Sequence, residues 1–376
     1  MRIIIAPDSF KGSLSSIEVA EAMERGVKKA APYSETILLP LSDGGEGLVD
    51  SLVTATGGQF LSLAVTGPLG KPVRAKMGLL GNGKTAVIEM AQASGLPLVP
   101  YEERNPLVTT TYGTGELIKH ALDQGCSELI IGIGGSATND GGMGMAQALG
   151  FKFLDGDGKP LGHGGGELAR LASIDVSGSD PRLGDVKIKV ACDVDNPLTG
   201  PQGAAAVYGP QKGATPEMVE FLDNALKNYD EVLARCLKKG VGSTPGAGAA
   251  GGLGAGLMAL LGGELVSGIE LVLDVLGFKE LTKGADLVFT GEGKFDAQSA
   301  YGKVPVGVGR QCKKLGVPVV VIAGTVLPDA EPLHAEGITA YFSIMNQPMS
   351  LEQAVNRTAE LVERQVGEVM RLWVQK

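Results

Sequence analysis

Short apolar segments alternate with amphipathic segments at both ends of the chain, and this alternation limits the fold more than any other feature. The N-terminal part predicts strands and helices in turn, over residues 2–6, 15–30, 36–39 and 47–56. In the first of these helices, Ala20, Met23 and Val27 fall on one face. Strands that alternate with helices form a parallel sheet covered by helices on both faces, so the sequence predicts an α/β fold.

The C-terminal part has the same pattern. It predicts strands over residues 286–290, 317–323 and 338–343, and helices over residues 299–315 and 351–362. Because the two ends share this alternation of strands and helices, we expect them to share one sheet.

The middle of the chain is less regular. Residues 73–80 and 84–90 predict a hairpin, because Asn82-Gly83 is a strong turn signal between two strands. Residues 66–72 resemble a linker, and a second crossing near residues 265–285 would return the chain to its first sheet. We therefore predict a discontinuous parallel-sheet domain, residues 1–65 plus 285–376, and an inserted mixed α/β domain, residues 66–284. A simple division near residue 200 is the alternative.

The composition excludes several classes of protein. The 376 residues include 33 Lys and Arg against 42 Asp and Glu, without a basic stripe, so neither nucleic acid nor a membrane is an expected partner. The four cysteines lack C-x-x-C spacing, and the N-terminal apolar segment is too short for a signal peptide, so a cytoplasmic location is expected. Residues 246–263 are uncharged but rich in glycine, which predicts a buried turn entering a helix rather than a membrane span.

Three turns that combine acids with glycines follow predicted strands, at residues 43–47, 139–142 and 291–296. Glycine lets backbone N–H groups approach a ligand, and carboxylates at a strand end can hold a metal ion or accept a proton. Such turns suit phosphate chemistry. The structural alternative is a tight connection between a strand and a helix.

Residues 78–85 match the P-loop pattern G-x-x-x-x-G-K-[ST]. A P-loop lies between a strand and a helix, whereas the adjacent β-branched residues Val87 and Ile88 predict a returning strand here. We interpret the match as the turn of the hairpin.

Residues 132–137 form a G-x-G-x-x-A turn after a predicted strand, and Asp155 ends the next apolar run. This is the outline of a dinucleotide site. The turn continues into polar and acidic residues 138–144, where a dinucleotide fold would already be helical, and these residues indicate a ligand surface. His163 lies in a glycine-rich loop and could contact a substrate. The sequence has neither His-x-x-x-His nor G-x-S-x-G, so it predicts neither a metal hydrolase nor a serine hydrolase.

The chain resembles the bacterial type I glycerate kinase family along its whole length. The resemblance is carried by residues 4–13, 40–47, 133–142, 191–198, 209–213, 245–252 and 290–296. It implies ATP-dependent phosphorylation of D-glycerate, usually at the 2-hydroxyl, by a Rossmann-like domain with an inserted second domain. Gly12 departs from the family, in which Glu is frequent, so no carboxylate role is assigned to that position.

Phosphoryl transfer needs neutralised phosphate charge, an aligned acceptor hydroxyl and a carboxylate that positions or deprotonates it. Asp193 and Asp296 are the candidates for the base and the Mg²⁺ ligand, with the two roles not divided between them. Lys11 follows the first strand and precedes a helix N-terminus, so it is expected to contact phosphate or the glycerate carboxylate.

Further residues in these motifs are expected to bind substrate or ATP. They are Asp8, Ser9, Asp43, Gly44, Gly45, Glu46, Ser136, Asn139, Asp140, Asn196, Lys212, Gly248, Gly251, Gly252, Glu292, Lys294 and Lys303.

We expect one site in a cleft between the two domains. Asp43 and Glu292 would face Asp140 and Asp193 there. Two other functions stay open at this point: an NAD-dependent oxidoreductase of a small hydroxy acid, supported by the Gly132 turn, and a carboxylate sensor that consumes no ATP.

Overall fold

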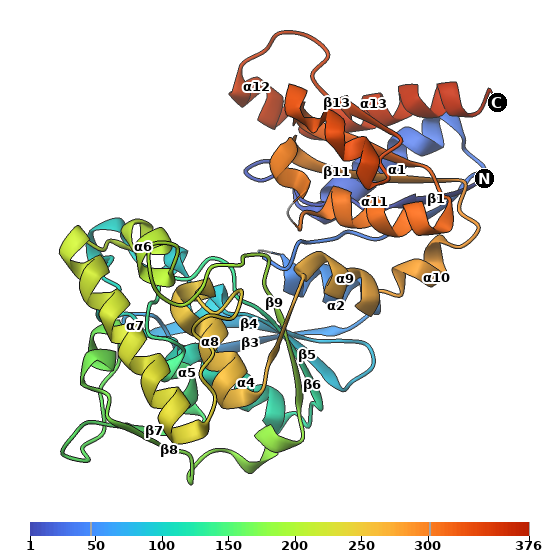
Figure 1. Cartoon of the computed structure of the whole chain (residues 1–376). Coiled ribbons are helices and arrows are strands. Elements are labelled where there is room, and N and C mark those ends of the chain that lie inside the picture. Colours follow the sequence, from blue (N-terminus) through green and yellow to red (C-terminus); the bar gives the residue numbers. More distant parts are fainter. Residues whose placement is uncertain (46, 301, 376) are drawn as a thin grey trace. The chain divides into compact units, whose positions relative to one another are not determined.

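The computed structural model describes residues 1–45, 47–300 and 302–375. The chain forms two compact units (Figure 1). Unit 1 comprises Met1–Asp43, Asp50–Ala55 and Ser267–Lys376, and unit 2 comprises Gly44–Val49 and Thr56–Val266. Each unit contains a sheet with helices, so the predicted α/β class is confirmed.

Unit 1 is built on a parallel sheet of five strands. Its order is β13-β12-β11-β1-β2, and every neighbouring pair is parallel. The strands are β1 (Arg2–Ile5), β2 (Glu35–Leu38), β11 (Leu287–Phe295), β12 (Val319–Val326) and β13 (Ala340–Ser343). The two ends of the chain therefore do share one sheet, because β1 pairs directly with β11.

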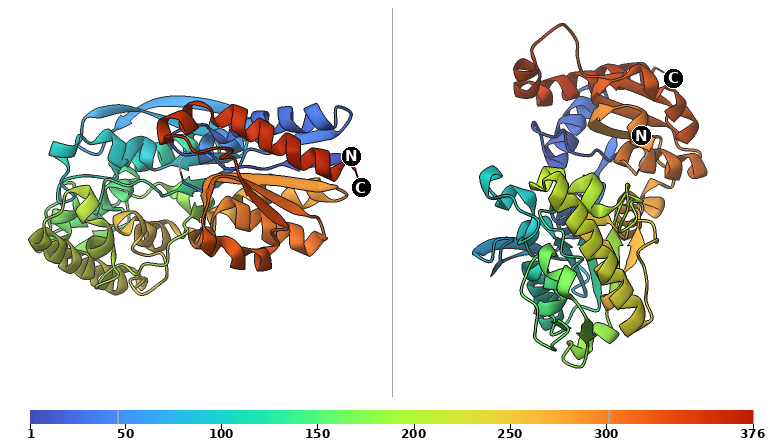
Figure 2. Two further views of the ribbon diagram at one scale, coloured as in Figure 1. Left: turned by 90° about the horizontal axis from the view of Figure 1, so that it is seen from above. Right: turned by 60° about the vertical axis from the view of Figure 1, so that its left-hand side comes forward.

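Helices cover both faces of this sheet (Figures 1 and 2). On one face, α1 (Ser16–Ala30) packs beside α13 (Thr358–Trp373), and their apolar residues join Ile3, Ile5 and Phe289 in one core. The other helices assigned mainly to this unit are α2 (Leu48–Thr56), α9 (Gly268–Val275), α10 (Phe278–Thr282), α11 (Val304–Leu315) and α12 (Leu351–Asn356).

Unit 2 is built on a mixed sheet of six strands in the order β10-β9-β6-β5-β4-β3. The strands are β3 (Gln59–Thr66), β4 (Pro72–Leu79), β5 (Thr85–Glu89), β6 (Glu128–Gly132), β9 (Lys187–Ala191) and β10 (Glu264–Val266). A separate two-stranded antiparallel sheet pairs β7 (Lys152–Leu154) with β8 (Ser173–Asp175). The helices are α3 (Ala91–Ser94), α4 (Tyr112–Asp123), α5 (Met143–Ala148), α6 (Ala204–Tyr208), α7 (Pro216–Leu237) and α8 (Ala249–Leu261).

The hairpin predicted around Asn82-Gly83 is confirmed, because β4 and β5 pair antiparallel. The Asn82 side-chain oxygen accepts hydrogen bonds from the backbone N–H groups of Lys84 at 2.9 Å and Thr85 at 3.0 Å. Thr85 begins a strand and not a helix, so the P-loop match has no P-loop geometry.

Two expected boundaries differ from the structure. Residues 66–72 belong to the β3–β4 hairpin and not to a linker, because Thr66 pairs with Pro72. A 2.7 Å hydrogen bond from Gly67 N–H to the Lys71 carbonyl closes the loop between them. Strand β11 continues through Gly291–Phe295, where a turn was expected, because these residues pair with β12 as far as Val326. A strand partner brought from elsewhere in the chain overrides the local turn preference of glycine.

The glycine-rich segment 246–263 enters the buried helix α8, as predicted. Within the part of the chain that the structure describes, no helix combines the length and the apolar character needed to cross a membrane.

Candidate active site

A cavity of about 300 Å³ opens in unit 1 where β1 and β11 end. The described residues that line it are Asp8, Ser9, Lys11, Asp43, Glu292, Gly293, Lys294 and Lys303. Of these eight, all except Gly293 are site residues expected from the sequence. Among the described residues, three carboxylates and three lysines therefore face one small volume.

Asp8 lies just beyond β1 and is 9% exposed. Its backbone N–H donates to the Gly291 carbonyl at 2.8 Å, and its Oδ1 accepts the Ser9 N–H at 2.6 Å. Burial and the nearby Asp43 carboxylate raise the pKa of Asp8 to about 7, and the Ser9 hydrogen bond opposes this. Asp8 can therefore change its charge near neutral pH.

Glu292 is held by two partners. The Ser299 hydroxyl donates to Oε1 at 2.6 Å, and the Lys303 ammonium lies 3.2 Å from Oε2. Burial raises the pKa of Glu292, while the Ser299 hydrogen bond and Lys303 lower it. Both oxygens thus point to fixed donors.

Asp296 follows β11 and forms an ion pair beside the cavity. The Lys294 ammonium lies 2.6 Å from its Oδ2, and the Gln298 N–H donates to Oδ1 at 3.0 Å. The Lys294 hydrogen bond holds the pKa of Asp296 below its ordinary value. Asp296 is therefore ionised at neutral pH and already has a cationic partner.

Two features suit the cavity to an anionic ligand. Lys11 follows β1 in a tight turn that closes between Phe10 and Leu14, and Gly12 occupies the left-handed region there with φ of 77°. Lys303 is the N-cap residue of α11, whose N-terminus carries partial positive charge. Glycine adopts this left-handed conformation without strain.

In unit 2, predicted residues gather around the end of β6. The backbones of Gly44 and Gly45 lie against Gly132 and Gly134, where an added Cβ would meet Gly44 O at 2.6 Å and Gly45 Cα at 3.5 Å. The approach requires glycine at position 132, whereas the contact at Gly134 is an ordinary van der Waals distance. Glu46, which was also predicted to bind ligand, lies outside the described residues.

Asp140 is fully buried and works as an acceptor for four donors. Its Oδ2 accepts from Thr111 N–H at 2.8 Å, Thr111 Oγ1 at 2.9 Å and Gly144 N–H at 3.3 Å, and its Oδ1 accepts from Gly142 N–H at 3.1 Å. Burial raises the pKa of Asp140, and these bonds oppose that rise. The carboxylate ties the start of α4 to the start of α5.

Lys212 is also buried, with 2% of its surface exposed. Its ammonium donates to the Thr138 carbonyl at 2.6 Å and to Ser136 Oγ at 3.1 Å. Burial lowers the pKa of Lys212 to about 7, and Asp140 opposes this effect. Next to this pair, Asn139 is fully buried, and neither polar atom of its side-chain amide has a hydrogen-bond partner.

The glycine-rich start of α8 packs onto the same loop. Ala250, Gly251 and Gly252 all have positive φ, and a Cβ at Gly251 would collide with the Thr138 carbonyl oxygen. The Gly248 N–H donates to the Asn196 carbonyl at 2.9 Å. The Asn196 side-chain N–H donates a hydrogen bond to the Gln202 carbonyl at 2.8 Å, and its Oδ1 accepts one from the Tyr208 hydroxyl at 2.6 Å. These predicted residues therefore hold loops of unit 2 together.

Asp193 is exposed in the segment that follows β9. Among the described residues, no three His, Cys, Asp or Glu side chains are grouped so that they could hold a metal ion. A magnesium ion that arrives with a nucleotide needs only one or two protein carboxylates, because phosphate oxygens and water complete its shell. A single carboxylate at Asp193 or Asp296 fits that requirement.

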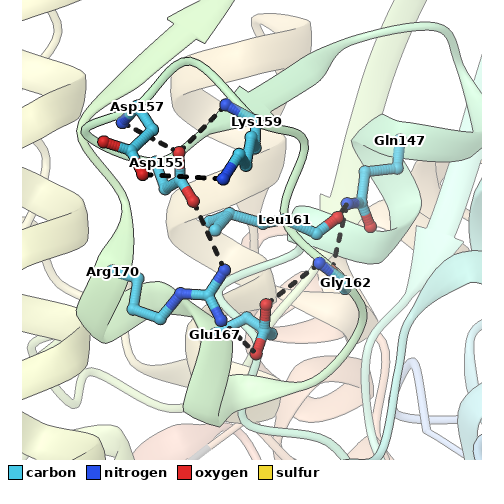
Figure 3. A network of polar contacts seen from close by, with 8 residues as sticks. All are labelled: Gln147, Asp155, Asp157, Lys159, Leu161, Gly162, Glu167 and Arg170. Carbon is cyan, nitrogen blue, oxygen red and sulfur yellow. Dashed lines mark hydrogen bonds and ion pairs between the residues drawn. The ribbon is translucent and has the colours of Figure 1, made fainter.

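Asp155 has a structural task in unit 2, as Figure 3 shows. Its Oδ1 accepts the N–H groups of Asp157 at 3.0 Å and Lys159 at 2.9 Å, and its Oδ2 lies 3.5 Å from Arg170. The carboxylate thus fixes the turn after β7. It is not presented to a ribose, so the dinucleotide outline lacks its acid.

His163 pairs with neighbours in its own unit. Its Nδ1 lies 3.0 Å from Gln147 Oε1, and its ring meets the edge of Tyr112 at 5.1 Å between centroids. The Gln147 amide in turn donates to the carbonyls of Leu161 and Gly162, both at 3.2 Å (Figure 3).

Three residues that adjoin the predicted site residues were not predicted from the sequence. Ser299 orients Glu292, Thr111 orients Asp140, and Tyr229 is buried near Gly141 with its hydroxyl unpaired. Ser299 follows Asp296 by three residues, a spacing typical of local capping, and this could have signalled its role. Thr111 and Tyr229 come from distant segments and carry no such signal.

Comparison with known proteins shows the family to which the chain belongs. The model of the glycerate kinase family matches residues 3–374. A glycerate kinase of Bacillus subtilis is 55% identical over 98% of this chain and 97% of its own length. A glycerate 2-kinase of Escherichia coli is 53% identical over 94% of this chain and 93% of its own length.

A solved structure is similar across the whole chain. It is the crystal structure of a protein from Salmonella typhimurium LT2 provisionally named glycerate kinase 2. The two superimpose with a TM-score of 0.90 at 50% identity, covering 100% of this chain and 98% of the other. The chain is therefore an enzyme that belongs to the glycerate kinase family.

Proposed function

We propose that this enzyme transfers the γ-phosphoryl group of ATP to D-glycerate, at the 2-hydroxyl, and forms 2-phosphoglycerate. The observation that carries the proposal is the cavity of unit 1, in which three carboxylates and three lysines face one volume. Phosphoryl transfer needs both kinds of group, cations for the phosphates and a carboxylate for the acceptor hydroxyl. The relatives named glycerate kinase and glycerate 2-kinase support the substrate.

Lysines supply the positive charge in this proposal. Lys11 and Lys303 line the cavity, and Lys303 also marks the N-terminus of α11. Ammonium groups and a helix N-terminus bind phosphate or carboxylate oxygens. They would hold the triphosphate and the glycerate carboxylate and reduce their mutual repulsion.

Carboxylates supply the remaining needs. Asp193 and Asp296 stay the proposed pair for acceptor positioning and magnesium binding. Magnesium, when bound with the nucleotide, neutralises charge on the phosphates. In unit 2, Gly44 lies against the end of β6 and Gly251 lies against the Thr138 carbonyl, and exposed backbone N–H groups in such turns suit phosphate oxygens.

A direct assay tests the function. Purified protein with Mg-ATP and D-glycerate should give ADP and phosphoglycerate, and phosphorus NMR of the product should show the 2-phosphate and not the 3-phosphate. The matched control is L-glycerate, which carries the same charge with the opposite configuration. The absence of any phosphoglycerate, while a known glycerate kinase is active in the same buffer, would refute the proposal.

The same experiment separates the alternatives. A carboxylate sensor would bind glycerate in calorimetry and leave ATP intact. The oxidoreductase interpretation has lost its main support, because Asp155 holds a turn and the helix after the Gly132 turn, α5, is only six residues long. The expected cytoplasmic location stays a prediction.

A further inference from the structure

We propose that Asp8 is the catalytic base that takes the proton from the attacking hydroxyl of glycerate. The inference rests on the proposed function and gives Asp8, which the sequence predicts only to bind substrate or ATP, a specific part in the reaction. It starts from the geometry of the cavity in unit 1, where Asp8 lies at the end of β1, next to the central strand pair β1 and β11.

The position of Asp8 is fixed from several directions. Its N–H is bound to the Gly291 carbonyl at 2.8 Å, and one carboxylate oxygen accepts the Ser9 N–H at 2.6 Å. The side chain is 9% exposed and still lines the cavity. A base must be held rigidly and must reach the ligand, and Asp8 meets both conditions.

The charged groups that face Asp8 come from every element around the cavity. Asp43 follows β2, Lys11 follows β1, Glu292 and Lys294 belong to β11, and Lys303 caps α11. Burial and Asp43 raise the pKa of Asp8 to about 7, with a further contribution from Glu292, while the Ser9 bond and Lys11 oppose the rise. A base whose pKa lies near the working pH transfers a proton most effectively.

Two other carboxylates of this region, Asp296 and Glu292, are less suited to be the base. Asp296 is bound to Lys294 at 2.6 Å, which lowers its pKa and weakens it as a proton acceptor. Glu292 has one oxygen on Ser299 and the other near Lys303. Asp8 has neither an ion pair within 4.0 Å among the described residues nor a hydroxyl donor.

The proposed step transfers one phosphoryl group and one proton. The hydroxyl oxygen of glycerate forms a bond to the γ-phosphorus, and its proton passes to the Asp8 carboxylate. The bond from the γ-phosphorus to the bridging β,γ-oxygen breaks, and ADP leaves with that electron pair. Asp8 then releases the proton to solvent, so the products are phosphoglycerate, ADP and one proton.

The test is the pH dependence of kcat/KM for D-glycerate in the intact enzyme. The wild-type enzyme should lose activity as the pH falls through about 7, because the base becomes protonated. Asp8→Asn should lower kcat by about 10²- to 10⁴-fold and should remove this acid limb. The charge-matched control Asp274→Asn, on the exposed side of α9, should leave both the rate and the limb unchanged.

A second variant reports on the same group without removing it. Asp43→Asn should move the acid limb to lower pH, because the carboxylate that raises the pKa of Asp8 is gone. A purely structural role for Asp8 would not produce this movement. If Asp8→Asn does not fold, the pH profile of Asp43→Asn decides alone. An acid limb at lower pH than in the wild type supports Asp8 as the base, and an acid limb at the same pH overturns that role.

The outcomes separate this inference from the proposed function. If the wild-type enzyme phosphorylates D-glycerate, and Asp8→Asn keeps the rate within a few fold or keeps the same acid limb, then Asp8 is not the base. The proposed function is unaffected by that result. Wild-type enzyme that forms no phosphoglycerate at any pH overturns the proposed function and the base together.

Discussion

At the scale of single residues, burial decides what each ionisable group can do. Asp8, Asp140 and Lys212 are all buried, yet their partners differ. Asp140 accepts four hydrogen bonds and Lys212 donates two, whereas Asp8 accepts one and faces two further carboxylates. A buried charge with many partners holds structure, and one with few partners is available for chemistry.

The first prediction at this scale concerns Asp8 and stability. The folded carboxyl keeps its proton up to about pH 7, and the unfolded one loses it near pH 4, so stability falls as the pH rises through that window. The shift of about three units corresponds to a penalty of about 4 kcal/mol at most above pH 7. Asp8→Asn should therefore stabilise the protein at pH 8 by up to that amount and much less at pH 4.

Urea unfolding of the two proteins at both pH values measures the difference. Equal stabilisation at pH 4 and pH 8 would contradict the raised pKa. Asp274→Asn again serves as the control for removing one negative charge from unit 1.

The second prediction concerns the Asp140 clamp. Asp140→Ala leaves its four donors without an acceptor in a buried site, so the free energy of unfolding should fall by at least about 3 kcal/mol. Asp157→Ala, at an exposed turn of the same unit, should change it by no more than about 0.5 kcal/mol. The denaturant midpoints of Asp140→Ala and Asp157→Ala measure this difference. Similar losses of stability in the two variants would mean that the hydrogen bonds of Asp140 contribute little to the stability of the fold.

At the scale of elements, glycine permits close approach where α8 begins. Gly251 has φ of 69°, and its missing Cβ leaves room for the loop at Thr138 and Asn139. Gly262 ends the same helix with φ of 68° and has open space around it. The two positions share a backbone conformation and differ only in crowding.

This pair gives the third prediction. Gly262→Ala should cost about 1–2 kcal/mol, the usual penalty for a left-handed alanine. Gly251→Ala should cost clearly more, at least about 3 kcal/mol, because the helix start must also move away from Thr138. Thermal unfolding measures the loss of stability in both variants, and the difference between the two losses is the steric cost at Gly251. Equal costs would show that the loop yields without strain.

At the scale of the whole molecule, ligand binding should be visible as stability. Any ligand that binds only the folded state stabilises it, by about 2.7 kcal/mol when its concentration is one hundred times Kd. D-glycerate with Mg-ADP should therefore raise the Tm of the intact chain, and L-glycerate should raise it less. The same Tm with both enantiomers would contradict a stereospecific glycerate site.

Part of the fold could be predicted from the sequence because it depends on local patterns. The alternation near Arg2–Ile5 and Leu287–Phe295 predicted strands that do pair, and Asn82-Gly83 predicted a hairpin that does form. The Gly and Pro residues of segment 66–72 predict a linker, but they suit a hairpin loop equally well, and the segment lies in the β3–β4 hairpin. Local composition does not distinguish the two.

Part of the candidate site could also be predicted. Acids and lysines beside glycines at strand ends indicated residues that now line one cavity, among them Asp8, Lys11 and Glu292. The supporting contacts from Ser299 to Glu292 and from Thr111 to Asp140 could not be predicted, because each depends on how separate turns or loops come together.

The α/β class, the hairpin and the family motifs can be recognised in the sequence, because periodicity and turn chemistry act over a few residues. Which acids are structural and which line a cavity depends on contacts between distant segments. Asp140 and Asp8 look alike in the sequence, each close to glycine or an apolar strand. Segments distant in the chain bring Asp140 four donors and Asp8 two like charges, and these surroundings set the ionisation of each carboxyl.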